Sequence, residues 1–299
     1  MDDEALSVWL RCRERADWRA RSAALTQAVV AGLPRDRAVQ VLDLATGAGS
    51  NLRYLAPHLP ARQRWRLIDR SPLLLSDAVA STRAWATERG YTMQGSVDLD
   101  SARFSIVGPH LDCHIETHAQ DLGTLDSPSM FSGRDLVTAS ALLDLVSESW
   151  LQTLASGCRA AGASALFTIT YDGRFSCGPA EPEDERVRAL MNAHQRRDKG
   201  LGGAAQGPDA AACALRCFAD EGYDVMCEPS DWVLGPDDAA MQRTLVDGWA
   251  EAASEVAPEE AETFASWRLR RLAHVDVGIS RCVVGHRDIA ALLPRRGDP

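Results

Sequence analysis

Three aspartates stand where short apolar segments give way to polar residues: Asp43, Asp69 and Asp121. Asp69 lies 20 residues after Gly49, which is close to the spacing at which an acidic residue meets a bound ribose. A ribose diol offers two O–H donors, and one carboxylate can accept both hydrogen bonds. The spacing therefore predicts a ligand that contains a nucleoside.

A turn of small residues at positions 45–49 precedes Asp69 in the chain. The apolar pattern of residues 39–44 predicts a strand before this turn, and the pattern of residues 52–59 predicts a helix after it. Gly47 and Gly49 let the backbone pass close to a ligand because they carry no Cβ. The helix start near Ser50 and Asn51 directs free N–H groups to the same place. A strand, a glycine turn and a helix in this order begin a nucleotide-binding βαβ unit.

The turn differs from the dinucleotide-binding pattern in two respects. Its third glycine is absent, because Ser50, Asn51 and Leu52 follow Gly49. A carboxylate at position 43 would repel a pyrophosphate but would attract a cationic amine. The residues 43–49 instead resemble the first motif of the class I S-adenosylmethionine-dependent methyltransferase family, acidic-x-G-x-G-x-G, with Ala45 in place of the first glycine.

The resemblance covers residues 38–172 well and implies S-adenosyl-L-methionine as the cofactor. Backbone groups from Ala45 to Gly49 would then hold the methionine portion, and Asp121 would accept a hydrogen bond from the adenine amino group. The expected cofactor-binding residues are Asp43, Ala45, Thr46, Gly47, Gly49, Asp69, Arg70, Asp121, Leu122 and Ser140.

Alternating strand and helix patterns predict an α/β fold. Strands are expected at 39–44, 65–69, 111–118, 135–140 and 165–170, and residues 91–110 are expected to form a loop or a hairpin insertion. The resemblance implies a Rossmann-like, doubly wound sheet of seven strands whose last strands, within 222–234 and 279–286, form a hairpin edge. Helices at 4–32 would form an N-terminal cap.

Nothing in the chain repeats, so one domain over residues 1–299 is expected in spite of the length. Its parts would be N-terminal helices (1–37), the cofactor-binding core (38–172), a helical substrate-side insertion (173–221) and C-terminal strands and helices (222–299). The insertion is bounded by prolines and rich in glycine, a composition that often carries specificity. His194, Gln195, Asp198 and Lys199 are its candidates for substrate contact.

Methyl transfer to a small molecule is the expected reaction, and the protein's main task would be to position donor and acceptor. A hydroxyl or a protonated amine must also lose a proton, so a base is needed. Asp144, Tyr171 and His194 are the expected catalytic residues, with Asp172 a further candidate. Asp144 and Ser140 follow the strand at 135–140, at the edge where open α/β sheets bind ligands. The alternative for this segment is capping of the next helix by Asp144 or Ser147.

Composition excludes several other classes of protein. A formal net charge of −10 argues against nucleic acid as a partner, and a neutral or cationic acceptor fits it better than an anionic one. The eight cysteines lack the spacing of a zinc site, so no metal is expected. No apolar run reaches the ~18 residues of a membrane helix, and the acidic N-terminus is not a signal peptide, so a cytoplasmic protein is expected.

Three alternatives stay open from the sequence. A nicotinamide-dependent oxidoreductase shares the βαβ start. A methyltransferase that acts on proteins would need an exposed groove in place of a closed pocket. A non-catalytic accessory protein would bind S-adenosylmethionine without turning it over. The acceptor, the atom methylated and the oligomeric state are left undetermined.

Overall fold

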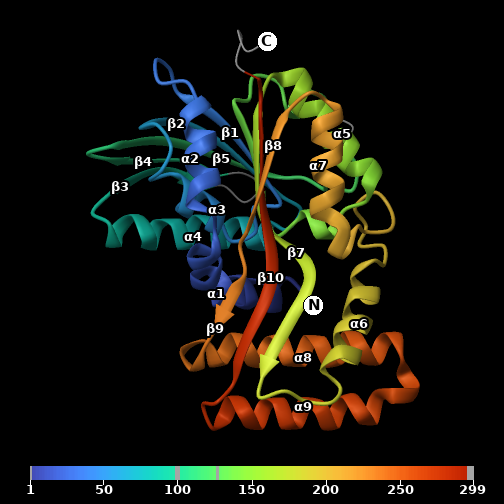
Figure 1. The fold of residues 1–299 in the computed structure, drawn as a ribbon. Helices are drawn as coiled ribbons and strands as arrows, with labels where there is room; N and C mark the ends of the chain where they lie inside the picture. Colours follow the sequence, from blue (N-terminus) through green and yellow to red (C-terminus); the bar gives the residue numbers. More distant parts are fainter. Residues whose placement is uncertain (1, 98–101, 126–127, 295–299) are drawn as a thin grey trace.

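A computed structural model describes residues 2–97, 102–125 and 128–294, and one mixed sheet runs through it (Figure 1). The strands lie in the order β3-β4-β5-β2-β1-β6-β7-β10-β8, and β9 pairs with β10. Their bounds are β1 Val39–Leu44, β2 Arg62–Asp69, β3 Thr92–Val97, β4 Ala102–Gly108, β5 Leu111–Ala119, β6 Leu136–Ser140, β7 Ser164–Gly178, β8 Asp224–Pro229, β9 Trp232–Leu234 and β10 Arg281–Leu292.

Five neighbouring strands, β5-β2-β1-β6-β7, run parallel to one another. The chain moves outward from β1 first through β2 to β5 and then, on the other side, through β6 to β7. The carboxyl ends of β1 and β6 therefore form the point at which the winding reverses, and open α/β sheets bind their ligands there. Strand β10 is antiparallel to both β7 and β8, which gives the sheet the expected hairpin edge.

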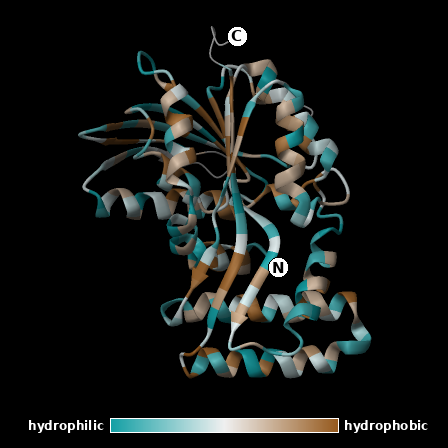
Figure 2. Ribbon diagram, in the orientation of Figure 1, coloured by the Kyte–Doolittle hydropathy of each residue, from teal (hydrophilic) through white to brown (hydrophobic). Residues whose placement is uncertain are grey.

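Helices cover both faces of the sheet (Figure 1). Apolar side chains of α2, α3 and α4 pack on one face, around Trp65 of β2, and those of α5 and α7 pack on the other, around Phe167 of β7. Figure 2 shows hydrophobic residues along the central strands, between these two layers. The helices are α1 Asp3–Ala20, α2 Ala23–Gly32, α3 Ser50–Leu55, α4 Pro72–Glu88, α5 Glu148–Ala161, α6 Asp184–Gln195, α7 Ala210–Asp220, α8 Ala239–Val256 and α9 Ala261–Asp276.

A third apolar cluster lies beyond the carboxyl ends of the parallel strands. There α8 and α9 pack beneath the extended parts of β7 and β10, together with α6 and side chains of α1 (Figure 1). Trp267 of α9 is fully buried, and its indole N–H donates to Asp184 at the start of α6. These added helices form a wall at the edge of the sheet where ligands are expected.

Local signals explain where the helices begin and end. Ser71 accepts a hydrogen bond from the backbone N–H of Leu74, and Pro72 occupies the first turn, so α4 starts as the sequence predicts. Ser147 caps α5 in the same way through Trp150, and Gly162 ends that helix in the left-handed conformation. Capping therefore belongs to Ser147 and leaves Asp144 free for other contacts.

Two expectations about the strands need comment. The segment 91–110 contains the hairpin of β3 and β4, which extends the sheet beyond β5, while its tip at 98–101 lies outside the described residues. The fifth parallel strand was expected to end at residue 170, and this was wrong. Strand β7 continues to Gly178 because β10 pairs with it through Cys177, so Tyr171 and Asp172 lie within the strand. Within the described residues, no helix combines the length and the apolarity needed to cross a membrane.

Candidate functional site

The turn after β1 contains three residues in the left-handed conformation. Ala45, Gly47 and Gly49 have φ values of 49°, 53° and 78°. The positive φ of Gly47 favours glycine, and a Cβ there would lie 2.8 Å from a methyl group of Leu10 in α1, which would have to move. Ala45 adopts the same left-handed conformation although it carries a Cβ, at a typical cost of about 1 kcal/mol. The turn therefore folds the backbone tightly beneath α1.

Asp43 is fully buried at the end of β1, behind this turn. Its two carboxylate oxygens accept hydrogen bonds from Thr46 Oγ1 and from Asn51 Nδ2. Asn51 in turn accepts from Arg21 at 2.8 Å. Burial raises the pKa of Asp43 to about 6, against the lowering effect of its hydrogen bonds. Asp43 therefore holds the turn and the start of α3 together from beneath the cavity.

Asp69 ends β2 and joins the glycine turn to the next helix. Its carboxylate accepts the backbone N–H of Gly47 at 2.8 Å and that of Ser71 at 3.0 Å. Burial raises the pKa of this carboxyl above its ordinary value, and the two backbone donors act in the opposite direction. A carboxylate has about four acceptor positions, so Asp69 keeps capacity for further donors.

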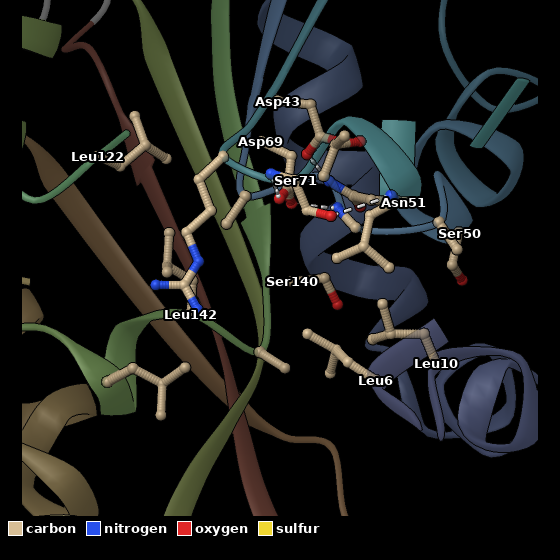
Figure 3. A pocket seen from close by; sticks show the side chains of 18 of the residues that line it. Leu6, Leu10, Asp43, Ser50, Asn51, Asp69, Ser71, Leu122, Ser140 and Leu142 are labelled. Carbon is tan, nitrogen blue, oxygen red and sulfur yellow. Dashed lines mark hydrogen bonds between the residues drawn. The ribbon is translucent and has the colours of Figure 1, made fainter. Parts of the chain in front are cut away.

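A cavity of about 380 Å³ opens beside these residues, and we call it the first cavity (Figure 3). In Figure 3 Asp43 and Asp69 lie together near Ser71, and Leu6 and Leu10 of α1 face the cavity from another side. Of the residues expected to bind the cofactor, the structure places nine in this lining: Asp43, Ala45, Thr46, Gly47, Asp69, Arg70, Asp121, Leu122 and Ser140.

Gly49 is the exception among the expected cofactor-binding residues. It does not line the first cavity. A Cβ at this position would lie 3.0 Å from the Cβ of Ala78 in α4, so Gly49 lets α4 approach the turn. Its contribution is to helix packing, a role that the resemblance alone did not distinguish from ligand contact.

Acidic groups dominate the polar part of the first cavity. Asp3 and Asp17 of α1 join Asp43, Asp69 and Asp121 in the lining, against the cationic Arg13, Arg70 and Lys199. The hydroxyl of Ser140, at the end of β6, is buried and makes no hydrogen bond within the described residues. The cavity therefore offers several acceptors and suits a ligand that carries hydroxyl and amino donors with a positive charge.

A second cavity, of about 390 Å³, adjoins the first. Leu6, Leu10 and Arg13 of α1, together with Ala141 and Leu145, line both cavities. The three residues expected to be catalytic, Asp144, Tyr171 and His194, line only the second. Of the substrate-contact candidates, Gln195 lines the second cavity and Lys199 the first, whereas Asp198 lines neither.

Asp144 differs from the other two expected catalytic residues in its bonding. It is 7% exposed, and its Oδ1 makes no hydrogen bond to any residue that the structure describes. Burial raises its pKa to about 6, and a backbone hydrogen bond to the carboxylate and the nearby charge of Arg13 oppose that rise. The Tyr171 hydroxyl already donates to Asn192, and His194 pairs with Glu255 at 3.0 Å. Asp144 is therefore the better placed of the three to take a proton.

His286 of β10 also lines the second cavity, although no sequence pattern predicted it there. The ring is 4% exposed, and its Nδ1 lies 3.0 Å from the carbonyl oxygen of Val284. A carbonyl only accepts, so Nδ1 carries the proton, and in the neutral ring Nε2 is left as an acceptor. Burial lowers the pKa of His286 to about 3, so the ring is neutral. No local motif marks this histidine, because only the pairing of β10 with β7 brings it to the cavity.

Metal binding has no support among the described residues, in which no cluster of three or more histidine, cysteine or acidic side chains could hold an ion. The cysteines are free thiols, and the most deeply buried ones, such as Cys158, pack in the apolar core.

Comparison with known proteins returned no matching family model and no matching curated protein. Solved structures similar to the chain include phosphoethanolamine N-methyltransferase 2 of Haemonchus contortus (12% identity, TM-score 0.42), which covers 99% of this chain and 59% of its own. Others are a cyclopropane synthase of Mycobacterium tuberculosis (12%, 0.41; 89% and 82% covered) and the YcgJ protein of Bacillus subtilis (13%, 0.44; 90% and 98% covered). The chain thus spans about three fifths of the length of the first of these.

The topology decides the fold. Five parallel strands wind in both directions from β1, and an antiparallel β10 is inserted between β7 and β8. This is the seven-stranded order with a hairpin edge that the motif at 43–49 implied. The chain has the class I methyltransferase fold. In this methyltransferase fold the first cavity lies at the carboxyl ends of β1 and β6. The hairpin β3–β4, the short strand β9 and the helices α8 and α9 are additions around the seven strands.

Proposed function

We propose that the protein binds S-adenosylmethionine in the first cavity and transfers its methyl group to a small molecule in the second. The observation that carries this proposal is the meeting of Asp43, Asp69 and Asp121 in one cavity around the turn at 45–49. Three strands supply these acids, and each ends at the same edge of the sheet. A dinucleotide would explain Asp69 but would leave Asp121 without a ligand contact.

The residues of the first cavity fit the parts of this cofactor. Asp69 would accept the ribose hydroxyls, since it keeps free acceptor positions beside its two backbone donors. Asp121 would accept the adenine amino group, and its carboxylate is positioned by the backbone N–H of Gly123 at 2.8 Å. The backbone of the turn would meet the methionine portion, together with Ser140, whose hydroxyl has no partner in the described part of the chain.

The cofactor would supply an electrophilic methyl group when bound, so the chain's own task is positioning and the exclusion of water. Leu6 and Leu10 of α1 cover the junction of the two cavities with apolar side chains. Asp144 would accept the proton that an O–H or N–H acceptor must lose, because it lies beside that junction with a carboxylate oxygen unpartnered.

The charge of the first cavity argues against the oxidoreductase alternative. The pyrophosphate of a nicotinamide cofactor would share the first cavity with the carboxylates of Asp3, Asp69 and Asp121. Like charges held close together in a partly buried site are unfavourable. A sulfonium and an ammonium group would be attracted by the same side chains.

Calorimetric titration with S-adenosylhomocysteine, NAD⁺ and NADP⁺ tests the proposal directly. We expect binding of S-adenosylhomocysteine alone. Incubation with S-adenosylmethionine and a metabolite panel, followed by mass spectrometry, should then show S-adenosylhomocysteine formed in step with a methylated product. Preferential binding of a nicotinamide cofactor would refute the assignment. Cofactor binding without any turnover would support an accessory protein.

A further inference from the structure

We propose that the second cavity receives a flat aromatic acceptor through its hydroxyl group, with Asp144 as the proton acceptor and His286 as a second hydrogen-bond acceptor. This inference rests on the proposed function, because it names the acceptor class of the same reaction. It adds the site of the acceptor, which is formed by residues of α1, β7, β10 and α8 that belong to no common sequence motif.

Aromatic side chains form the walls of the second cavity. Trp9, Trp232, Trp249 and Tyr171 line it, and the remaining wall is mainly aliphatic. Trp249 is held by stacking on Phe175, with ring centroids 4.0 Å apart and an angle of 3° between the planes. Trp9 meets Trp232 edge to face at 6.1 Å. Fixed aromatic walls favour a flat apolar guest, because rings pair with rings in these geometries.

Two buried acceptors stand among these apolar walls. Asp144 Oδ1 has no partner among the described residues, and His286 presents an unprotonated Nε2 because its Nδ1–H donates to the Val284 carbonyl. Buried polar groups without partners are costly, so both acceptors favour a ligand that brings an O–H or N–H donor. A saturated hydrocarbon would leave both acceptors unsatisfied.

The charges around Asp144 select a neutral hydroxyl over an ammonium group. Arg13 lines both cavities and pairs with Asp17 at 3.4 Å, and the cation of Lys199 lines the first cavity and acts on Asp144 from there. A bound sulfonium would add a third positive charge. An ammonium acceptor would be repelled by this set, whereas an oxygen that gains negative charge as it loses its proton would be stabilised.

The proposed step balances in atoms and charge. The hydroxyl proton moves to Oδ1 of Asp144, and the oxygen forms a bond to the methyl carbon of the sulfonium. The carbon–sulfur bond breaks, and its electron pair stays on sulfur as a neutral thioether. Asp144 then releases the proton to solvent, which leaves a methyl aryl ether and S-adenosylhomocysteine.

The helix α8 offers a variant that narrows the second cavity without disturbing the fold. Thr244, Gly248 and Ala252 succeed one another at intervals of four along its lining face. A Cβ added to Gly248 meets no atom within 4 Å, and leucine favours a helix interior over glycine, so Gly248→Leu should fold. Ala240→Leu is the matched control, because Ala240 is exposed on the same helix, as Gly248 is, but lies outside both cavities.

The test has a binding arm and a turnover arm. Quenching of tryptophan fluorescence by 2-naphthol should saturate in the wild type and in Ala240→Leu. In Gly248→Leu the Kd for 2-naphthol should rise at least tenfold. With S-adenosylmethionine, 2-naphthol and phenol should yield methyl ethers, while benzylamine and alkylamines should not. Asp144→Asn, which keeps an acceptor oxygen but cannot take the proton, should lose turnover at least a hundredfold even at naphthol concentrations that saturate its own binding.

Two results would overturn this inference. One is equal naphthol binding by Gly248→Leu and the control, or no binding at all. The other is methylation of amines, with no reaction of any hydroxyarene, by protein that binds S-adenosylhomocysteine. Failure of the proposed function is distinguishable from both, since it would show as absent S-adenosylhomocysteine binding whatever naphthol does.

Discussion

Replacement of Asp69 by asparagine tests the cofactor site at its most constrained residue. The carboxylate accepts two backbone N–H groups, from Gly47 and Ser71, before any ligand is bound. Asparagine offers one oxygen, so one of these donors loses its acceptor and a ribose hydroxyl loses another. Hydrogen bonds to a charged group typically contribute 1.5–3 kcal/mol. We therefore expect losses of about 2 kcal/mol in cofactor binding and about 2 kcal/mol in unfolding free energy.

Calorimetry with S-adenosylhomocysteine measures the first loss, and urea unfolding followed by circular dichroism measures the second. A loss of about 2 kcal/mol in binding corresponds to a roughly 30-fold increase in Kd. The matched control is Asp135→Asn. Asp135 also accepts a backbone N–H, that of Gln40 at 2.8 Å, but it lies just before β6, at the amino ends of the parallel strands. This control should lose stability without losing affinity. Unchanged affinity in a folded Asp69→Asn protein would refute the assignment of Asp69.

Three further predictions concern stability. The carboxyl group of Asp144 has a pKa of about 6 in the folded protein, against an ordinary value of 3.8. Its preference for the protonated form stabilises the fold below about pH 4, and this stabilisation is lost as the pH rises through 6. Asp144→Asn leaves Arg13 and Lys199 in place, and it should raise the unfolding free energy relative to the wild type by about 2 kcal/mol at pH 7.5 but not at pH 4. Urea unfolding at both pH values measures this, and a gain that does not depend on pH would contradict the prediction. Ala45→Gly should raise the unfolding free energy by up to about 1 kcal/mol, because glycine adopts a φ of 49° without strain, and a lower melting temperature would count against it. Arg271→Ala should cost at least about 3 kcal/mol by leaving Asp184 without its buried partner, with S-adenosylhomocysteine affinity unchanged once the protein is folded.

The strands and the acidic edge of the sheet could be predicted because they depend on local patterns. Apolar alternation identified the segments around Asp43 and Asp69, and parallel strands with their carboxyl ends at one edge necessarily bring such residues near one another. The turn at 45–49 was recognisable for the same reason, since a left-handed backbone limits the residue types that it accepts. These are properties of a few neighbouring residues and need no knowledge of distant contacts.

The second cavity could not be predicted in this way. His286 reaches it only because β10 returns between β7 and β8, and Leu6 and Arg13 reach it only because α1 lies over the turn. The length of β7 likewise depends on its pairing with β10, 105 residues away at Cys177 and Cys282. The sequence by itself determined the strands, the turn and the acids at the sheet edge, because short-range backbone geometry requires those residue types. The tertiary structure alone decided which side chains enclose the acceptor, because apolar burial brought together segments that share no local pattern.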